Sequence, residues 1–267
     1  SPFVSVGQGR RQAAGGRRHR IFEQSECRAR KYHSNAARRV GRRGMGVSIR
    51  SALPDPTEQF FEVIRNYNNA VWPAQIVLTL LAVVVIGLLR TGQSGATRVI
   101  FAILGLNWAW IATAYHLAFF AAINPAAYAF ALLFYLGSAA FLWSALRPGG
   151  LIISDRRDSN SALGGGLIAY ALIVYPVWSS LTGHAYPNLP TFGLPCPTTI
   201  FTIGALAMVR GGRTWPLFIA PILWALVGVQ AAFLLSVLPD LGLSVAGLAG
   251  MMLAVRSRRQ IPRPVQA

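Results

Sequence analysis

One stretch of the chain, GHAYPNLPTFGLPCPTTIFT at residues 183–202, concentrates the side chains that could do chemistry. It carries no charge, yet it holds His184, Cys196, four prolines and five threonine or tyrosine hydroxyls between two long apolar runs. His116, in an earlier apolar run, is the only other histidine after Met45. Imidazole and thiol groups can bind zinc or copper. Hydroxyls and unpaired backbone carbonyls can instead hold a small solute, so two kinds of site are open.

A metal site would use His116, His184 and Cys196, because three protein ligands and one open position form the usual catalytic arrangement. The protein would then be a membrane metalloenzyme of the hydrolase type. Against this, the three ligands show no HxxxH or CxxC spacing, and no carboxylate lies within a predicted span to act as general base. The sequence therefore implies no cofactor firmly, leaves a metal ion open and does not establish an enzyme.

A solute-binding pocket is the second kind of site. Prolines interrupt regular hydrogen bonding, and non-helical backbone at membrane depth is tolerated where it lines a cavity. Unpaired carbonyls and the N-terminus of a helix starting at 195 could hold a small polar or anionic ligand. Because the predicted spans contain no charged residue, an ion-coupled pump is disfavoured. The candidate ligand-binding residues are His116, Asn124, His184, Tyr186, Thr191, Cys196, Thr198 and Thr199.

A purely structural role is the third interpretation. The prolines would fold a re-entrant loop, Thr198 and Thr199 would bond back to the preceding turn, and Cys196 would fill apolar space. The protein would then be a structural or scaffolding membrane protein. The presence of two histidines and a thiol in one layer favours a site.

Composition places these residues in a membrane protein. The 267 residues are 54% hydrophobic and only 12% charged, with a mean hydropathy of +0.45, which is too little charge to cover a soluble globule. The formal net charge of +17 is uneven, since residues 1–44 hold twelve of the 25 Lys and Arg. We predict a disordered basic extension there, with a true start at Met45 as the alternative interpretation, and expect no nucleic-acid partner.

Charge-free intervals define the elements that must position the site. After Asp55, a candidate N-cap, we expect a short amphipathic helix within 45–71 that lies in the membrane interface or packs on the bundle. A transmembrane domain over 72–256 and a cytoplasmic tail over 257–267 follow. The domain is predicted as an all-α bundle of seven helices, at 72–89, 99–121, 126–146, 163–182, 195–209, 215–237 and 241–255, the last being short.

Loop charges predict the orientation of this bundle. All arginines from Arg90 onward fall in the connections after the first, third and fifth helices and in the C-terminal tail. The positive-inside rule therefore predicts an external N-terminus and a cytoplasmic C-terminus. The stretch at 183–202 would be the external crossing, with His116 in the same layer. Small residues at Gly242, Ala246 and Gly250, and at Gly165 and Ala169, predict close helix packing within the bundle.

Three segments carry a family resemblance: YNNAVWPAQ at 67–75, WAWIATAYHLAFFAAINPAAYAF at 108–130, and YPVWSSLTGHAYPNLPTFGLPCPTTIFTIG at 175–204. They resemble the bacterial multi-pass membrane family known as domain of unknown function 6064, from about Pro54 to the C-terminus. The resemblance implies a multi-pass protein of the bacterial cytoplasmic membrane, with the lipid bilayer as its surroundings. It implies no activity, and it does not extend over the first 44 residues.

Overall fold

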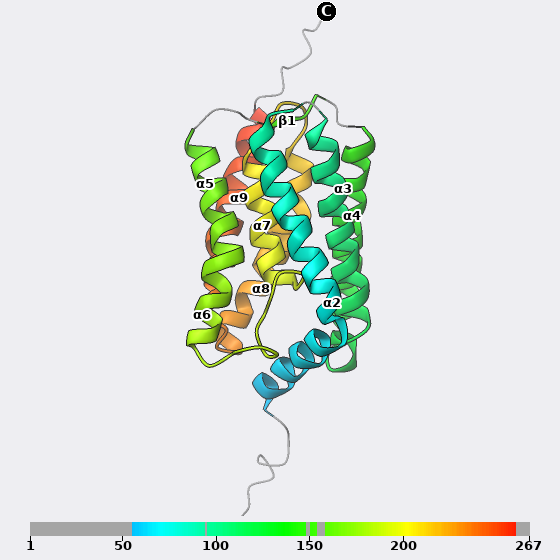
Figure 1. Ribbon diagram of the computed structural model, residues 1–267, viewed down its shortest axis with the longest axis vertical. Coiled ribbons are helices and arrows are strands. Elements are labelled where there is room, and N and C mark those ends of the chain that lie inside the picture. Colours follow the sequence, from blue (N-terminus) through cyan, green and yellow to red (C-terminus); the bar gives the residue numbers. More distant parts are fainter. Residues whose placement is uncertain (1–54, 94, 148–149, 154–157, 260–267) are drawn as a thin grey trace, which may run out of the picture. The chain divides into compact units, whose positions relative to one another are not determined.

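A computed structural model of the chain describes residues 55–93, 95–147, 150–153 and 158–259 (Figure 1). The chain divides into residues 1–53 and a unit over 54–267, and everything below concerns the second unit. The predicted basic extension and most of the predicted tail lie outside the described residues. So do Arg156, Arg157 and Arg263.

The described residues are mostly helical, and they include one two-stranded sheet whose strands lie far apart in the sequence. Several helices continue without a break into π-helical or 3-10 turns, labelled η. Strands β1 and β2 are antiparallel, with Ile152 opposite Arg210. The elements are α2 (Pro56–Thr91), α3 (Ala96–Trp110), η2 (Ile111–Leu117), η3 (Phe120–Ala122), α4 (Ala127–Leu146), β1 (Ile152–Ile153), α5 (Ser159–Ala169), η4 (Tyr170–Val174), α6 (Tyr175–Leu181), α7 (Pro195–Ala207), β2 (Val209–Arg210), η5 (Trp215–Phe218), α8 (Ile219–Leu234), η6 (Leu238–Asp240) and α9 (Leu241–Arg259).

Six of the described helical segments are long and apolar enough to cross a membrane. Large apolar side chains point outward from them, among them Leu80, Leu132 and Leu248, each more than half exposed. Such a surface is soluble only in lipid. The prediction of an all-α membrane bundle is therefore confirmed. The six segments are Pro56–Thr91, Ala96–Ala122, Ala127–Leu146, Ser159–Leu181, Trp215–Leu234 and Leu238–Arg259.

The first helix is longer than the sequence suggested. Residues 56–71, expected as a separate interfacial helix, form the first part of the 36-residue helix α2. The Asp55 side chain accepts a hydrogen bond from the Thr57 N–H at its start, as an N-cap does. Figure 1 shows the blue N-terminal part of α2 running obliquely to the rest, and Pro73 lies inside the helix. Ile64 and Tyr67 are buried, so this part packs on the bundle.

The fifth predicted helix is the short one. Helix α7 has 13 residues and so extends about 20 Å, less than the ~30 Å of a bilayer core. Every residue of α7 except Cys196 is buried. The helix begins inside the bundle and not at its edge, because the chain before it first runs back inward (Figure 1). The last predicted helix, which was expected to be short, is instead part of a full-length candidate span.

Small residues bring helices into backbone contact. A methyl group added at Gly164 of α5 would lie 2.5 Å from the Gly204 carbonyl oxygen of α7, so only glycine fits this crossing. The line Gly242, Ala246 and Gly250 on α9 packs inside the bundle as predicted, with Gly242 against the Tyr170 ring. Gly165, expected to pack, has nothing within 4 Å of an added methyl group.

The bundle has two chemically different ends. At the N-terminal end, where α2 begins and α9 begins, the only described arginine is Arg65. At the C-terminal end, where α2 and α9 finish, lie Arg90, Arg98, Arg147, Arg210, Arg213, Arg256, Arg258 and Arg259. The structure thus gathers the arginines on one end. Which end faces the cytoplasm stays a prediction.

Candidate functional site

The stretch at 183–202 folds into an extended, re-entrant segment followed by α7. Its carbonyls need donors, and its prolines cannot supply N–H groups for a regular ladder. Side chains of α2 do so: Asn68 Nδ2 donates to the Pro187 and Leu189 carbonyls at 2.6 and 2.8 Å. Gln75 Nε2 donates to Thr191 Oγ1 at 3.1 Å. Polar side chains of α2 therefore hold the re-entrant segment in place.

The end of this segment next to α7 is fixed by a second set of contacts. The Tyr67 hydroxyl donates to the Gly193 carbonyl at 3.1 Å and accepts from Trp110 Nε1 at 2.8 Å. The Gly193 N–H donates to Thr198 Oγ1 at 3.0 Å, which ties the segment to the first turn of α7. As a result, the start of α7 and Cys196 are held inside the bundle.

A cavity of about 130 Å³ lies beside the start of α7, near the N-terminal end of the bundle. Six aromatic residues line it, and Cys196 and Asp240 are also among its lining residues. Asp240 is the only charged residue among the described residues that line the cavity. The aromatic lining residues are Phe60, Tyr115, Phe120, Phe130, Tyr175 and Trp224.

Asp240 is the central polar group of this site. It lies in η6, directly before α9, and is only 1% exposed. The Tyr175 hydroxyl donates a hydrogen bond of 2.5 Å to Oδ1. Within the described residues, Oδ2 has no oxygen or nitrogen donor, although the Cys196 thiol interacts with the carboxyl group. A buried carboxylate without a cation or a full set of donors is costly, so such a group marks a functional candidate.

Two π-helical turns position the residues around the cavity. Tyr175 follows directly on η4, and Pro176 after it lacks the N–H that would bond to the carbonyl of residue 172. Tyr115 lies within η2. π-helical turns often occur at functional sites, because they redirect one side chain without ending the helix. Here they place the two tyrosines, from different helices, against the same cavity.

His116 lies beside the cavity in a nest of aromatic rings. Its ring centroid is 4.9 Å from that of Phe134 and 5.2 Å from that of Trp224. Phe130 and Phe120, which line the cavity, also contact it. The side chain is fully buried, and neither ring nitrogen has a hydrogen-bond partner among the described residues. His116 therefore packs among the aromatic side chains around the cavity, and we assign it no ligand-binding role.

The other predicted residues serve separate purposes. His184 stacks on Phe61 at 3.8 Å, away from the cavity, and burial lowers its pKa. Asn124 Oδ1 accepts from the Ala126 N–H, which is a local turn contact. The Tyr186 hydroxyl donates to the Asn68 carbonyl, so it joins the anchoring contacts. Thr199 is buried, and its hydroxyl has no partner among the described residues.

The eight predicted ligand-binding residues thus do not form one site. Of the eight predicted residues, the structure places Cys196 in the cavity and His116 beside it, while Tyr186, Thr191 and Thr198 anchor the re-entrant segment. In the described part of the chain, no group of three or more His, Cys, Asp or Glu side chains could hold a metal ion. The trio of His116, His184 and Cys196 is therefore not assembled as a metal site.

Sequence reasoning missed Asp240. It lies between the helices predicted at 215–237 and 241–255, and so outside the predicted spans. One signal pointed to it: Asp240 is the only acidic residue after Asp158. A single acid in more than a hundred residues of membrane protein is worth testing as a site.

Comparison with known proteins identifies a family. No curated protein and no solved structure matches the chain. The family described as "Family of unknown function (DUF6064)" matches residues 57–263, which include the anchoring residues of α2, the re-entrant segment and Asp240. The chain belongs to this family of unknown function.

Proposed function

We propose that the protein binds a small alkylammonium ion in the cavity lined by Asp240. The observation that carries this proposal is that Asp240 lines the aromatic cavity and that one oxygen of its buried carboxylate lacks an N–H or O–H donor. An ammonium group in that space would supply both a charge and a donor to Oδ2. No basic residue is among the described residues that line the cavity, so a bound cation would meet no competing positive charge.

The size and walls of the cavity support the same ligand class. An apolar cavity of about 150 Å³ holds benzene, so about 130 Å³ is enough for about four to six non-hydrogen atoms. Aromatic faces attract cations through the ring quadrupole, and alkylated ammonium groups are commonly held in such aromatic cages. The anionic ligand suggested by the helix N-terminus is disfavoured, because it would face the Asp240 carboxylate.

The proposal is one of binding, in a passive or sensory role. We place the protein in the bacterial cytoplasmic membrane, with the N-terminal end of the bundle outside. The arginines gathered at the opposite end support this orientation. The cavity would then receive its solute from the external side. The lipid bilayer is the remaining partner that we propose.

Calorimetric titration of detergent-purified protein tests the ligand class. tert-Butylammonium, which carries N–H donors, is the cationic probe, and tert-butanol, with the same number of non-hydrogen atoms, is its neutral counterpart. We expect the cation to bind and acetate not to bind. Replacing Asp240→Asn keeps the shape and the Tyr175 contact but removes the charge, so affinity for tert-butylammonium should fall at least about tenfold, since a charge-assisted hydrogen bond in such a site contributes over about 1.4 kcal/mol.

Asp158→Asn is the matched control, because it removes one carboxylate at the other end of the bundle and should leave binding unchanged. Equal binding of the cation and tert-butanol, or unchanged cation affinity in Asp240→Asn, would contradict the proposal. Stoichiometric zinc, copper or iron in the purified protein, lost on replacing His116 by Ala, would favour the metalloenzyme instead. Absence of any solute binding would favour the structural role.

A further inference from the structure

The C-terminal end of the bundle carries a second hollow, of about 790 Å³, whose chemistry is opposite to that of the Asp240 cavity. Four arginine side chains line it: Arg147, Arg210, Arg213 and Arg256. They come from the end of α4, from strand β2, from the turn before α8 and from the last turns of α9. Segments far apart in the sequence therefore converge to place guanidinium groups around one space.

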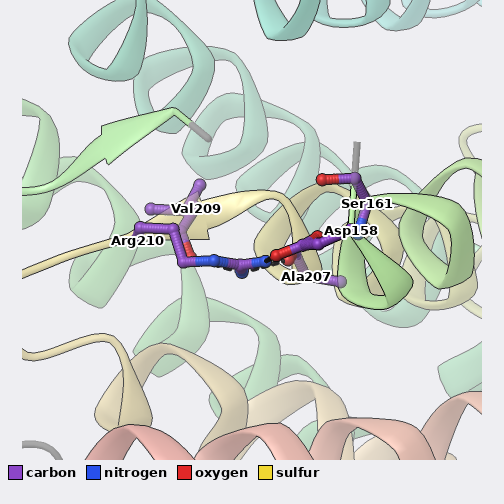
Figure 2. Close-up of polar contacts among 5 residues, drawn as sticks. All are labelled: Asp158, Ser161, Ala207, Val209 and Arg210. Atoms are coloured by element: carbon purple, nitrogen blue, oxygen red, sulfur yellow. Dashed lines mark hydrogen bonds and ion pairs between the residues drawn. The ribbon is translucent and has the colours of Figure 1, made fainter. Parts of the chain in front are cut away.

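Two of these arginines contact other side chains of the bundle. Arg210 Nη2 forms an ion pair of 2.8 Å with Asp158 Oδ2, and its Nη1 donates to the Ala207 carbonyl at 2.7 Å (Figure 2). The Arg147 guanidinium lies 4.5 Å from the ring centroid of Trp143. Arg213 and Arg256 are exposed, and within the described residues they form no ion pair. The hollow therefore has more positive charge than the described chain neutralises.

We propose that this hollow binds the phosphate group of an anionic ligand. Guanidinium groups present paired N–H donors that match phosphate oxygens, and basic pockets between membrane helices typically bind anionic headgroups. The position favours an anionic phospholipid as the source of the phosphate. The hollow lies where the spans end, and Trp143, 59% exposed, is the kind of residue found at headgroup level. Apolar lining residues such as Leu217 and Leu253 would contact the acyl chains.

The variant that tests this site is the pair Arg213→Gln and Arg256→Gln, which leaves the structural arginines intact. Native mass spectrometry of detergent-purified protein measures retention of phosphatidylglycerol against zwitterionic phosphatidylethanolamine. Each basic residue near an anionic surface contributes about 1 kcal/mol, so the double variant should bind phosphatidylglycerol about 30-fold more weakly. The control pair Arg90→Gln and Arg98→Gln removes the same charge from the same end but outside the hollow, and should change affinity less than about threefold.

A second arm separates the two sources of phosphate and uses the unaltered protein. If inorganic phosphate or glycerol phosphate competes for the site at micromolar concentration, the ligand is a soluble phosphate compound; if only the lipid binds, it is a headgroup. In either case binding should weaken as sodium chloride is raised. Equal retention of phosphatidylglycerol by both double variants, or retention independent of salt, would overturn the proposal. This site lies at the opposite end of the bundle from Asp240, so its outcome is independent of the proposed ammonium binding.

Discussion

Gly193 is the residue at which the re-entrant segment turns into the bundle. Its φ is +98°, a conformation that side-chain-bearing residues rarely adopt. A methyl group added there would lie 2.7 Å from Leu78 Cδ1 on α2. Its carbonyl and N–H are both used, by Tyr67 and Thr198. Glycine is therefore required for two reasons, backbone conformation and close approach.

Replacing Gly193→Ala should destabilise the protein by about 1–3 kcal/mol, because the backbone strain is added to a clash with Leu78. Gly165→Ala is the matched control, since its added methyl group meets nothing and alanine favours helix by about 0.5–1 kcal/mol. Thermal unfolding in detergent, followed by circular dichroism, measures both. An unchanged midpoint for Gly193→Ala would mean that the segment can shift away from α2.

At the same residue scale, sequence could predict which side chains were unusual but not what they contact. Cys196 was expected in a pocket because of its type and neighbours, and it lines one. Thr191 and Tyr186 were also singled out, yet both serve to anchor the backbone. Asp240 could not be predicted as a buried group, because its burial arises from the packing of α6, α7 and α8, which no local pattern encodes.

At the element scale, the start of α5 shows how one contact ties two helices together. Asp158 is the N-cap of α5, and its Oδ1 accepts from the Ser161 N–H at 2.9 Å. Its Oδ2 binds Arg210, just after α7 (Figure 2). The Ser161 backbone hydrogen bond, followed by Arg210, lowers the pKa of Asp158 from 3.8 to about 2. The charged form is therefore favoured in the folded state.

Because the folded pKa lies below the unfolded value, this contact stabilises the protein fully above about pH 4, and the stabilisation is lost as the pH falls toward 2. We expect Asp158→Asn, which keeps a capping side chain but not the ion pair, to show a smaller loss of thermal stability between pH 5 and pH 2. The measurement is the difference in unfolding midpoint between the two proteins across that range. Parallel pH profiles would show that the Asp158 contact does not contribute.

The elements themselves were largely predictable, because charge-free intervals mark residues at membrane depth. All seven expected helices are present in the described chain, most with ends within a few residues. Two features of the elements could not be predicted from the sequence. Apolar content cannot distinguish an extended re-entrant segment from helix, so the short α7 was expected to start at the membrane edge. The length of α2 was the second, because the amphipathic pattern within 45–71 indicates a separate surface helix, whereas its Asn68 binds the re-entrant segment.

At the scale of the whole bundle, charge is separated between the two ends. Eight described arginines lie at the C-terminal end, and four of the five described acids, Asp55, Glu58, Glu62 and Asp240, lie at the other. The re-entrant segment and α7 together run from one end of the bundle to the other (Figure 1). The proposed cation cavity and the proposed phosphate site follow this polarity, one at each end.

The same polarity yields a test of orientation. A reporter enzyme active only outside the cytoplasm should be active when fused after Gly183, which follows four complete spans, and silent when fused after Gly212 or Arg259, which follow an odd number of crossings. The reason is the positive-inside rule, which retains arginine-rich connections in the cytoplasm. A cytoplasm-active reporter at the same three positions is the control and should give the opposite pattern. Activity after Arg259 together with silence after Gly183 would invert the bundle, and would place the Asp240 cavity on the cytoplasmic side and the arginine hollow outside.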